Sequence, residues 1–387
     1  MNEGALNIDG NSVANGWQIP PIARPGDPLS DVDTPALVLD LTAFEDNLEA
    51  MQGLVDRHGV ALRPHAKAHR CPEISLRQLA RGAIGVCCQK VSEIVPFLAA
   101  GIRDIHLSNE VVGNDKLDLL ARLARHGSIT VCVDHAQAAQ ALSSALVKHQ
   151  TSMGVLVEVD VGQSRCGVQA PEELIALAQQ LQALPQVHFA GIQAYHGGLQ
   201  HTRGLDERRG AWKEAVALIR RHLDALAHAG IACPVVTGGG TGSAMLDVTS
   251  DVFTEIQAGT YAFMDADYGG IDWEAATKFQ HSLFLLTTVM SRPTPDRAVL
   301  DVGLKSTTAE SGMPQVVGFP GVRCVSVNDE HSILDIENGV AAPELGAKIR
   351  LIPGHCDPTF NLHDYVVGIR NGYVEAVWPI SARGMSR

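Results

Sequence analysis

Eight short apolar runs, each ending in polar residues or glycine, constrain most strongly how this chain can fold. They alternate with stretches of helical periodicity and lie at residues 61–67, 84–89, 105–110, 129–134, 155–160, 190–197, 235–240 and 255–263. Nearly continuous apolar strands separated by helices indicate a parallel sheet with right-handed crossovers. Eight such units are what a closed (β/α)8 barrel requires, so we predict that fold rather than an open doubly wound sheet, which usually has fewer strands.

After residue 280 the pattern changes to strands without long helices. The last of these strands contains Asn371-Gly372 between two alternating runs, which is a strong signal for a two-residue hairpin. We therefore predict an N-terminal arm over residues 1–30, loosely ordered over the surface, a barrel over 31–275 and an all-β domain over 276–387. The run at 36–40 precedes the first barrel unit, and its pairing with the β domain stays open.

Charge and composition exclude several classes of partner. The 387 residues carry 43 acidic and 30 basic side chains, a formal charge of -13, so a nucleic acid or an anionic membrane would be repelled. No run approaches the ~20 apolar residues that a membrane span needs. The eight cysteines are scattered, most of them in apolar runs where reduced thiols behave as small hydrophobes, and this distribution predicts a reducing cytoplasm.

Polar residues at the ends of the predicted strands should converge, because all strands of a parallel barrel end on the same face. They describe a pocket with one lysine, two tyrosines and a glycine-rich turn. The set comprises His65, Lys67, Gln89, Asn109, Asp160, Tyr195, His196, Thr237, Gly238, Gly239, Gly240 and Tyr261.

The glycine-rich turn at 237–243, TGGGTGS, follows an apolar strand, so its amides and hydroxyls could cradle a phosphate. A plain tight turn explains it equally well. A lysine in a dry, positive pocket loses its proton and becomes a nucleophile toward aldehydes. Pyridoxal phosphate supplies both an aldehyde and a phosphate, so Lys67 together with this turn predicts that cofactor, although Lys67 could also simply pair with a carboxylate.

Arg165, just beyond the fifth strand, is a candidate partner for a ring nitrogen or a substrate carboxylate. A guanidinium facing the pyridine nitrogen would keep that nitrogen largely unprotonated and would weaken the cofactor as an electron sink. The alternative is an ordinary surface cation.

A second cluster of candidate ligands, GHCDP, lies at residues 354–358 in the β domain. His355 and Asp357 are two residues apart, so on an extended segment both side chains would point to one face. An imidazole and a carboxylate suit Mn²⁺ or Mg²⁺ and could accept Zn²⁺. The H-x-D spacing alone is a poor metal motif.

The linked motifs RPHAKAH, LVEVDVGQSRCGV, TGGGTGS, QAGTYAFMDADYG and PGHCDPTFNLHD resemble the D-threonine aldolase family. This family belongs to the fold-type III pyridoxal-phosphate group, together with 3-hydroxy-D-aspartate aldolase and D-serine dehydratase. The resemblance runs in register from about residue 20 to the C-terminus and implies an alanine-racemase-like barrel followed by a β domain.

The resemblance also implies roles for individual residues. Lys67 resembles the lysine that carries the cofactor, Arg165 the arginine that faces the pyridine nitrogen, and His355 and Asp357 the aldolase metal pair, with Mn²⁺ as the first choice. D-Serine dehydratases have a cysteine where this chain has Asp357, which favours aldol cleavage. The remaining implied cofactor contacts are Gln89, Tyr195, Thr237, Gly239, Gly240, Thr241 and Tyr261.

The implied activity is the cleavage of a D-3-hydroxy-α-amino acid to glycine and an aldehyde, and we choose His201 as the base that removes the β-hydroxyl proton. A homodimer is expected because relatives often dimerise. Alternatives are a 3-hydroxy-D-aspartate aldolase, a dehydratase or racemase on the same scaffold, and a non-catalytic pyridoxal-phosphate carrier. A cofactor-free metal hydrolase would need more His and Asp at the strand ends.

Overall fold

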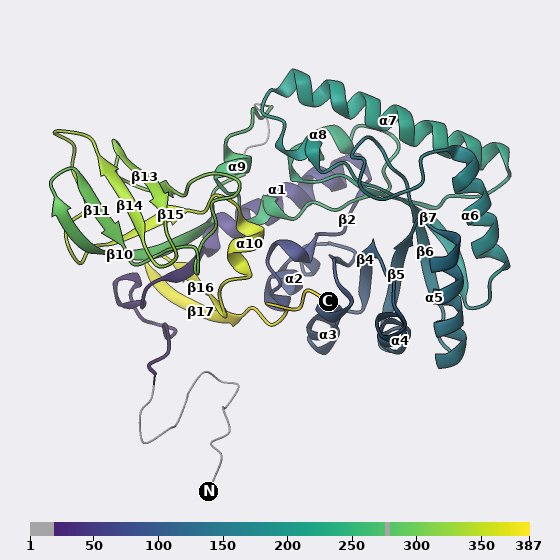
Figure 1. The fold of residues 1–387 in the computed structure, drawn as a ribbon, viewed down its shortest axis with the longest axis horizontal. Coiled ribbons are helices and arrows are strands. Elements are labelled where there is room, and N and C mark those ends of the chain that lie inside the picture. Colours follow the sequence, from purple (N-terminus) through teal and green to yellow (C-terminus); the bar gives the residue numbers. More distant parts are fainter. Residues whose placement is uncertain (1–18, 275–278) are drawn as a thin grey trace, which may run out of the picture.

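The computed structural model describes residues 19–274 and 279–387 and contains two sheets (Figure 1). The first sheet has eight parallel strands with neighbours in the order β2-β9-β8-β7-β6-β5-β4-β3. Each strand overlaps one of the eight predicted runs. The bounds are β2 Ala61–Leu62, β3 Val86–Cys88, β4 Asp104–Glu110, β5 Ser128–Val133, β6 Met153–Glu158, β7 Val187–Ala194, β8 Val235–Gly238 and β9 Glu255–Ile256.

The two outer strands of this sheet, β2 and β3, meet and close it. The amide of Ile84 donates to the carbonyl of Leu62 at 2.9 Å, and the amide of Cys87 donates to the carbonyl of Pro64 at 2.8 Å. His65 and Cys87 also form a parallel bridge. The predicted barrel, alanine-racemase-like in its combination with a second β domain, is therefore confirmed.

Helices cover the outside of the barrel (Figure 1), and side chains of Asp40, His135 and Asp265 cap the N-termini of α1, α5 and α9. In α1 the Asp40 carboxylate accepts from the amides of Thr42 and Ala43, and Gly59 ends the helix with a φ of 67°. The helices are α1 Leu41–His58, α2 Pro72–Leu79, α3 Val91–Ala99, α4 Asn114–Leu123, α5 Ala136–His149, α6 Pro171–Ala183, α7 Leu205–His228, α8 Ala244–Asp247, α9 Ala266–Gly269 and α10 Cys356–Phe360. Within the described residues, none is both long and apolar enough to cross a membrane.

The second sheet has nine strands and forms the β domain on the left of Figure 1. Asn371 and Gly372 both have positive φ, 52° and 82°, so the predicted hairpin between β16 and β17 is confirmed. The strands are β1 Ala36–Asp40, β10 Leu283–Thr294, β11 Arg297–Leu300, β12 Gln315–Val316, β13 Val322–Val327, β14 Ser332–Ile336, β15 Lys348–Ile352, β16 Tyr365–Arg370 and β17 Tyr373–Pro379.

The chain passes between the two domains at both ends. Strand β1 pairs antiparallel with β10 and parallel with β16, so it lies inside the nine-stranded sheet while the following helix α1 runs along the barrel. At the other end, the Ser92 hydroxyl in α3 donates to the carbonyl of Arg387 at 2.6 Å. The predicted boundary near residue 275 lies outside the described residues.

Part of the predicted N-terminal arm is fixed to the β domain. The amides of Gly26 and Leu29 each donate at 2.8 Å to the β16–β17 hairpin, to the carbonyls of Val374 and Gly372. The expectation of a loosely ordered arm is therefore wrong for this stretch, because the hairpin tip leaves backbone acceptors that the arm satisfies. Residues 1–18 lie outside the described residues.

We expect Gly191→Ala to destabilise the barrel. Gly191 has a φ of 148°, and a Cβ there would lie 1.9 Å from the carbonyl oxygen of Val235 in the next strand, so β7 and β8 would have to separate. The expected loss is about 2 kcal/mol or more of unfolding free energy, visible as a lower thermal midpoint. The matched control is Gly210→Ala in α7, where a Cβ meets nothing within 4 Å. It should be neutral or slightly stabilising, and equal midpoints for the two variants would contradict this reading of the strand contact.

Candidate active site

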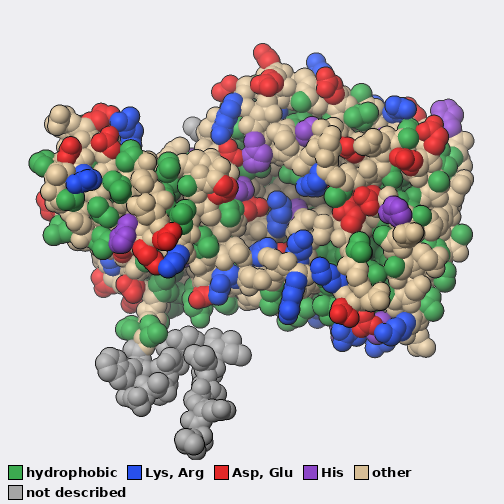
Figure 2. All heavy atoms as spheres, viewed as in Figure 1, with side chains coloured by type: hydrophobic (Ala, Val, Ile, Leu, Met, Phe, Trp, Pro, Cys, Tyr) green, Lys and Arg blue, Asp and Glu red, His purple; other side chains and the backbone are tan. Residues whose placement is uncertain are grey.

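One pocket lies at the carboxyl ends of the barrel strands and receives residues from both domains. Figure 2 shows histidine, basic and acidic side chains gathered around a hollow where the barrel meets the β domain. Of the twelve residues to which the sequence assigns a catalytic, cofactor or metal role, nine line the pocket, and Thr237, Gly239 and Tyr261 do not. Of the other predicted strand-end residues, His65 lines it, whereas Asn109, Asp160, His196 and Gly238 do not. The lining residues are His65, Lys67, Ala68, Gln89, Ser108, Arg165, Gln193, Tyr195, His201, Gly240, Thr241, Gln257, Gly259, Thr260, Tyr268, His355 and Asp357.

Lys67 lies in a short 3-10 turn, Ala66–Ala68, that follows β2. Its Nζ is 3.3 Å from the Asp357 carboxylate of the β domain. This carboxylate raises the pKa of Lys67 and outweighs burial, which would lower it. The expectation of a positive pocket that lowers the lysine pKa is not met, because Asp357 lies close to Nζ, which the sequence spacing did not reveal.

His355 and Asp357 meet, but not on an extended segment. His355 is the N-cap of α10, and Asp357 is in the first turn of that helix. Their nearest side-chain atoms, Nε2 and Oδ1, are 3.9 Å apart. The predicted local geometry is wrong, because the turn of α10, rather than the two-residue period of a strand, brings the two side chains together.

Asp265, the N-cap of α9, orients the His355 ring. Its fully buried carboxylate accepts from Nδ1 of His355 at 2.8 Å and from the amide of Cys356 at 2.9 Å, which leaves Nε2 facing Asp357. Burial opposes the imidazolium, but the hydrogen bond to Asp265 and the charge of Asp357 outweigh it and raise the pKa of His355 to about 9. The site therefore favours a positive charge at this ring.

The His355–Asp357 pair fits a divalent ion. Burial would raise the pKa of Asp357, yet Lys67 and His355 hold it at about 2, so the group is a carboxylate. An ion with ligand distances of about 2.1 Å can bridge two atoms 3.9 Å apart. Ligand-type atoms of Asp265, His355 and Cys356 also lie within 4.8 Å of one another. We favour the first pair, because Asp265 is already bonded to Nδ1 and Cys356 is fully buried.

His201 ends the 3-10 turn η3, Gly198–His201, and its ring faces the same part of the pocket. Its centroid is 6.3 Å from that of His355 and 5.2 Å from that of Tyr268. Nδ1 of His201 is hydrogen-bonded to the carboxylate of Asp267, which is 6% exposed. A carboxylate on Nδ1 fixes the ring tautomer and leaves Nε2 as the proton acceptor.

Arg165 and Tyr195 lie together in the pocket. The guanidinium carbon is 5.6 Å from the centroid of the tyrosine ring. Nη2 of Arg165 is 3.5 Å from Glu158, whose pKa is raised by burial and by the neighbouring Glu110 against the effect of Arg165. Arg165 therefore lines the pocket and contacts Tyr195 and Glu158, so it is not an isolated surface cation.

The glycine-rich turn reaches the pocket only with its middle residues. Gly240 and Thr241 line it, together with Gly259 and Thr260 after β9. Thr237 is fully buried and accepts from the Gln257 amide group at 2.8 Å. Gly239 has a φ of 64°, and a Cβ there would lie 2.3 Å from Asp247. Thr237 and Gly239 therefore support the turn and do not line the pocket, and their contact with a cofactor stays a prediction.

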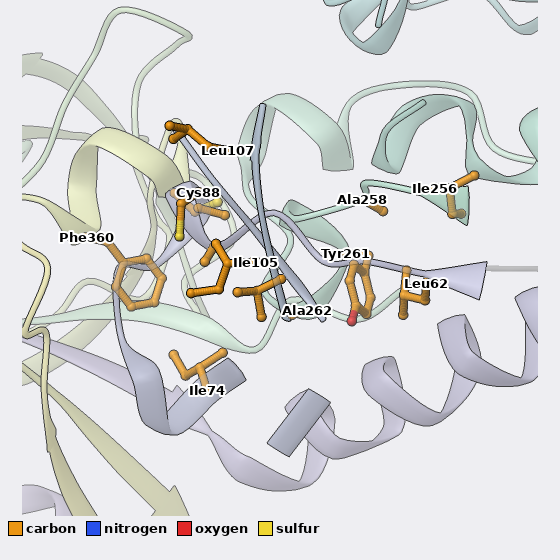
Figure 3. Close-up of a cluster of buried hydrophobic side chains, with 14 of the residues drawn as sticks. Leu62, Ile74, Cys88, Ile105, Leu107, Ile256, Ala258, Tyr261, Ala262 and Phe360 are labelled. Atoms are coloured by element: carbon orange, nitrogen blue, oxygen red, sulfur yellow. The ribbon is translucent and has the colours of Figure 1, made fainter. Parts of the chain in front are cut away.

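Tyr261 is a core residue. Its ring is fully buried beside Leu62 in the hydrophobic cluster that Figure 3 shows, and its hydroxyl is 3.1 Å from the side-chain amide nitrogen of Gln78. Only its backbone is near the turn, where its amide donates to the hydroxyl of Thr241 at 3.0 Å. The 3-10 turn Thr260–Ala262 directs the side chain away from the pocket, so only the backbone of Tyr261 could contribute to the predicted phosphate cradle.

The sequence reasoning missed several residues that line the pocket and two, Asp265 and Asp267, that bind its histidines. Asp265, Asp267 and Tyr268 lie in MDADYG, and no strand-end rule applies to a segment that comes after the last barrel strand. Thr260 is a polar residue that follows β9, so the expectation that polar strand-end residues line the pocket could have found it, but Tyr261 was chosen instead. The other missed residues are Ala68, Ser108, Gln193, Gln257 and Gly259.

Family models cover most of the chain. The model for the alanine racemase N-terminal domain matches residues 39–267, and the model for a putative serine dehydratase domain matches residues 282–369. The two matches cover the barrel and much of the β domain, respectively. The predicted likeness to a fold-type III enzyme is thus confirmed for both parts.

Individual relatives extend over almost the whole chain. A D-threonine aldolase from Arthrobacter sp is 58% identical over 375 residues, 97% of this chain and 99% of the relative. A 3-hydroxy-D-aspartate aldolase from Paracoccus denitrificans is 44% identical and covers 95% of this chain and 96% of its own length. The crystal structure of a D-threonine aldolase from Filomicrobium marinum superposes with a TM-score of 0.93 at 44% identity, covering 95% of this chain and 100% of that chain. The chain therefore belongs to the D-threonine aldolase family, within the fold-type III pyridoxal-phosphate group.

Proposed function

We propose that this protein cleaves D-3-hydroxy-α-amino acids of the D-threonine type to glycine and an aldehyde, with pyridoxal phosphate and a divalent ion. The observation that carries the proposal is the convergence of Lys67 with the His355–Asp357 pair, 3.3 Å away, in one pocket. The 58% identity to a D-threonine aldolase supports it.

The pocket residues fit pyridoxal phosphate. Lys67 would hold its aldehyde carbon, Gly240, Thr241 and Thr260 would surround its phosphate, and Arg165 would face its ring nitrogen. The bound cofactor supplies an electron sink for the bond that breaks at the substrate Cα. An arginine cannot give up its proton, so at this position it would leave the ring nitrogen unprotonated.

A divalent ion, Mn²⁺ in our proposal with Mg²⁺ as an alternative, would be held by Nε2 of His355 and by Asp357. Such an ion lowers the pKa of a hydroxyl that it binds. The contribution of the protein is the orientation of the ligands: Asp265 fixes Nδ1 of His355 at 2.8 Å and so directs Nε2 at the site.

His201 is the proposed base. Its free Nε2 would accept the proton of the substrate β-hydroxyl while Asp267 holds Nδ1. The Cα–Cβ bond can then break as the aldehyde carbonyl forms. Tyr268 lies against both the His201 and the His355 rings and limits their rotation.

A 3-hydroxy-D-aspartate aldolase is the second candidate, because a relative of that name is 44% identical over 376 residues. Asp357 in place of a cysteine argues against a dehydratase. The two-domain site argues against a simple cofactor carrier. A homodimer and a cytoplasmic location remain part of the proposal, and the eight free cysteines support a reducing compartment.

Glycine release provides the direct test of the reaction. The purified protein, loaded with pyridoxal phosphate, should release glycine from D-threonine and not from L-threonine. Chelation should abolish the release, and Mn²⁺ should restore it, because the ion is needed at the hydroxyl. Absence of glycine under every condition would refute the aldolase proposal. Keto acid formed from D-serine would move the protein to the dehydratase branch, and glyoxylate released faster from 3-hydroxy-D-aspartate would favour the second candidate.

His355→Ala should remove the ion. We expect the affinity for Mn²⁺, measured by titration calorimetry or by electron paramagnetic resonance, to fall by about 100-fold or more, because one of two protein ligands is lost. The matched control is His331→Ala, which changes an exposed histidine of the same domain. Unchanged Mn²⁺ binding by the His355 variant would exclude the assigned ligand pair.

Asp267→Asn should lower kcat and leave KM nearly unchanged, because the amide no longer fixes the tautomer in which Nε2 of His201 accepts a proton. The expected loss is about 10- to 100-fold, and His201→Ala should lose about 100-fold or more. Asp206→Asn, on the exposed first turn of α7, is the matched control. Near-normal turnover by the His201 variant would remove this residue from the mechanism.

A further inference from the structure

Gln200, the residue before His201, joins two segments of the pocket. It is 1% exposed. Its Nε2 donates to the hydroxyl of Ser243 at 2.8 Å, and its Oε1 accepts from the amide of Ser243 at 3.1 Å. Ser243 ends the 3-10 turn Thr241–Ser243, which begins at the pocket wall. One side chain therefore connects the His201 segment to the glycine-rich turn through both of its amide atoms.

Two glycines of the turn are required by this contact. A Cβ on Gly240 would lie 2.6 Å from Oε1 of Gln200, and a Cβ on Gly242 would lie 2.4 Å from the main-chain oxygen of Gln200. Neither glycine has a positive φ, so the backbone conformation does not demand glycine there. The close approach of the η3 segment explains why small residues stand at these positions.

The other side of Ser243 is anchored to helix α7. The hydroxyl of Ser243 donates to Asp247 at 2.5 Å, and Nε1 of Trp212 donates to the second oxygen of the same carboxylate at 3.1 Å. Asp247 is 2% exposed, and burial raises its pKa to about 7 against the effect of these hydrogen bonds. Because Gln200 and Asp247 both bind the Ser243 hydroxyl, the position of Ser243 is restrained where it contacts Gln200.

We propose that Gln200 is a positioning residue that sets His201 relative to the phosphate subsite at Gly240 and Thr241, so that a bound phosphate orders the His201 segment. This inference rests on the proposed function, which assigns His201 as the base and Gly240 and Thr241 as phosphate contacts. Its structural basis does not depend on that function. Within the described residues, Gln200 is the only residue of the turn Gly198–His201 whose side chain forms hydrogen bonds with Ser243. A displacement of about 1 Å at a base can cost 10²-fold in rate.

Amide hydrogen exchange of the peptide spanning residues 197–204 tests the coupling. In the wild-type protein, pyridoxal phosphate should slow the exchange of this peptide by about tenfold relative to the cofactor-free protein, and pyridoxal, which lacks the phosphate, should not. Gln200→Met keeps the volume but loses both hydrogen bonds to Ser243 and a longer one, 3.4 Å, to the carbonyl of His196. In this variant pyridoxal phosphate should still bind, as measured by absorbance, without slowing the exchange. The kcat of this variant should fall by about 10- to 100-fold while KM changes little.

The controls separate positioning from packing. Gln140→Met, on the exposed face of α5, should behave as wild type in both measurements. Ser243→Ala removes the hydroxyl that accepts from Nε2 of Gln200. This variant should lose part of the cofactor-induced slowing of exchange. It replaces Gln200→Met in the test if Gln200→Met does not fold. Full slowing of exchange and normal kcat in Gln200→Met would overturn the proposal, as would unchanged exchange in the wild-type protein. Exchange coupling in a protein that releases no glycine would refute the proposed function and leave this inference standing.

Discussion

The pairing of β1 with β10 and β16 is the constraint on which the rest of the site depends. Strand β1 lies within the sheet of the β domain, and α1 continues from it along the barrel, so the first element of the barrel domain is built into the second domain. This arrangement fixes the β domain over the carboxyl ends of the barrel strands. The contact of Asp357 with Lys67 lies across this junction of the two domains.

The charged groups across the domain junction alternate in sign. Lys67, His355, Asp265 and Asp357 form a chain of contacts of 2.8 to 3.9 Å. In this chain the pKa of each basic group is raised and that of Asp357 is lowered. Each buried charge is compensated by a neighbour, as buried charges must be. A divalent ion at Nε2 of His355 would take the place of the proton that the two carboxylates now favour.

The sequence was a good guide wherever a residue's position follows from a repeating pattern. Eight apolar runs gave eight strands, and strand ends correctly placed Lys67, Gln89 and Tyr195 in the pocket. Pattern reasoning failed where a short 3-10 or α-helical turn decides the direction of a side chain. Tyr261 turns into the core, and His355 and Asp357 meet through α10 rather than along a strand. Such turns depend on tertiary contacts, which local spacing does not encode.

The segment around α9 shows why part of the site was invisible to sequence reasoning. Asp265 binds His355 and Asp267 binds His201, so two carboxylates two residues apart orient the two rings that would act on the substrate hydroxyl. Each residue looks ordinary alone, because an aspartate at the N-cap or in the first turn of a helix is common. They meet the two rings because α10 from the β domain and η3 from the barrel both contact α9 and its N-cap. The amides of Ala266 and Asp267 donate to the carbonyls of Pro353 and Gly354, which holds α9 against the segment that carries His355 and Asp357, so the contact between the domains forms part of the pocket wall.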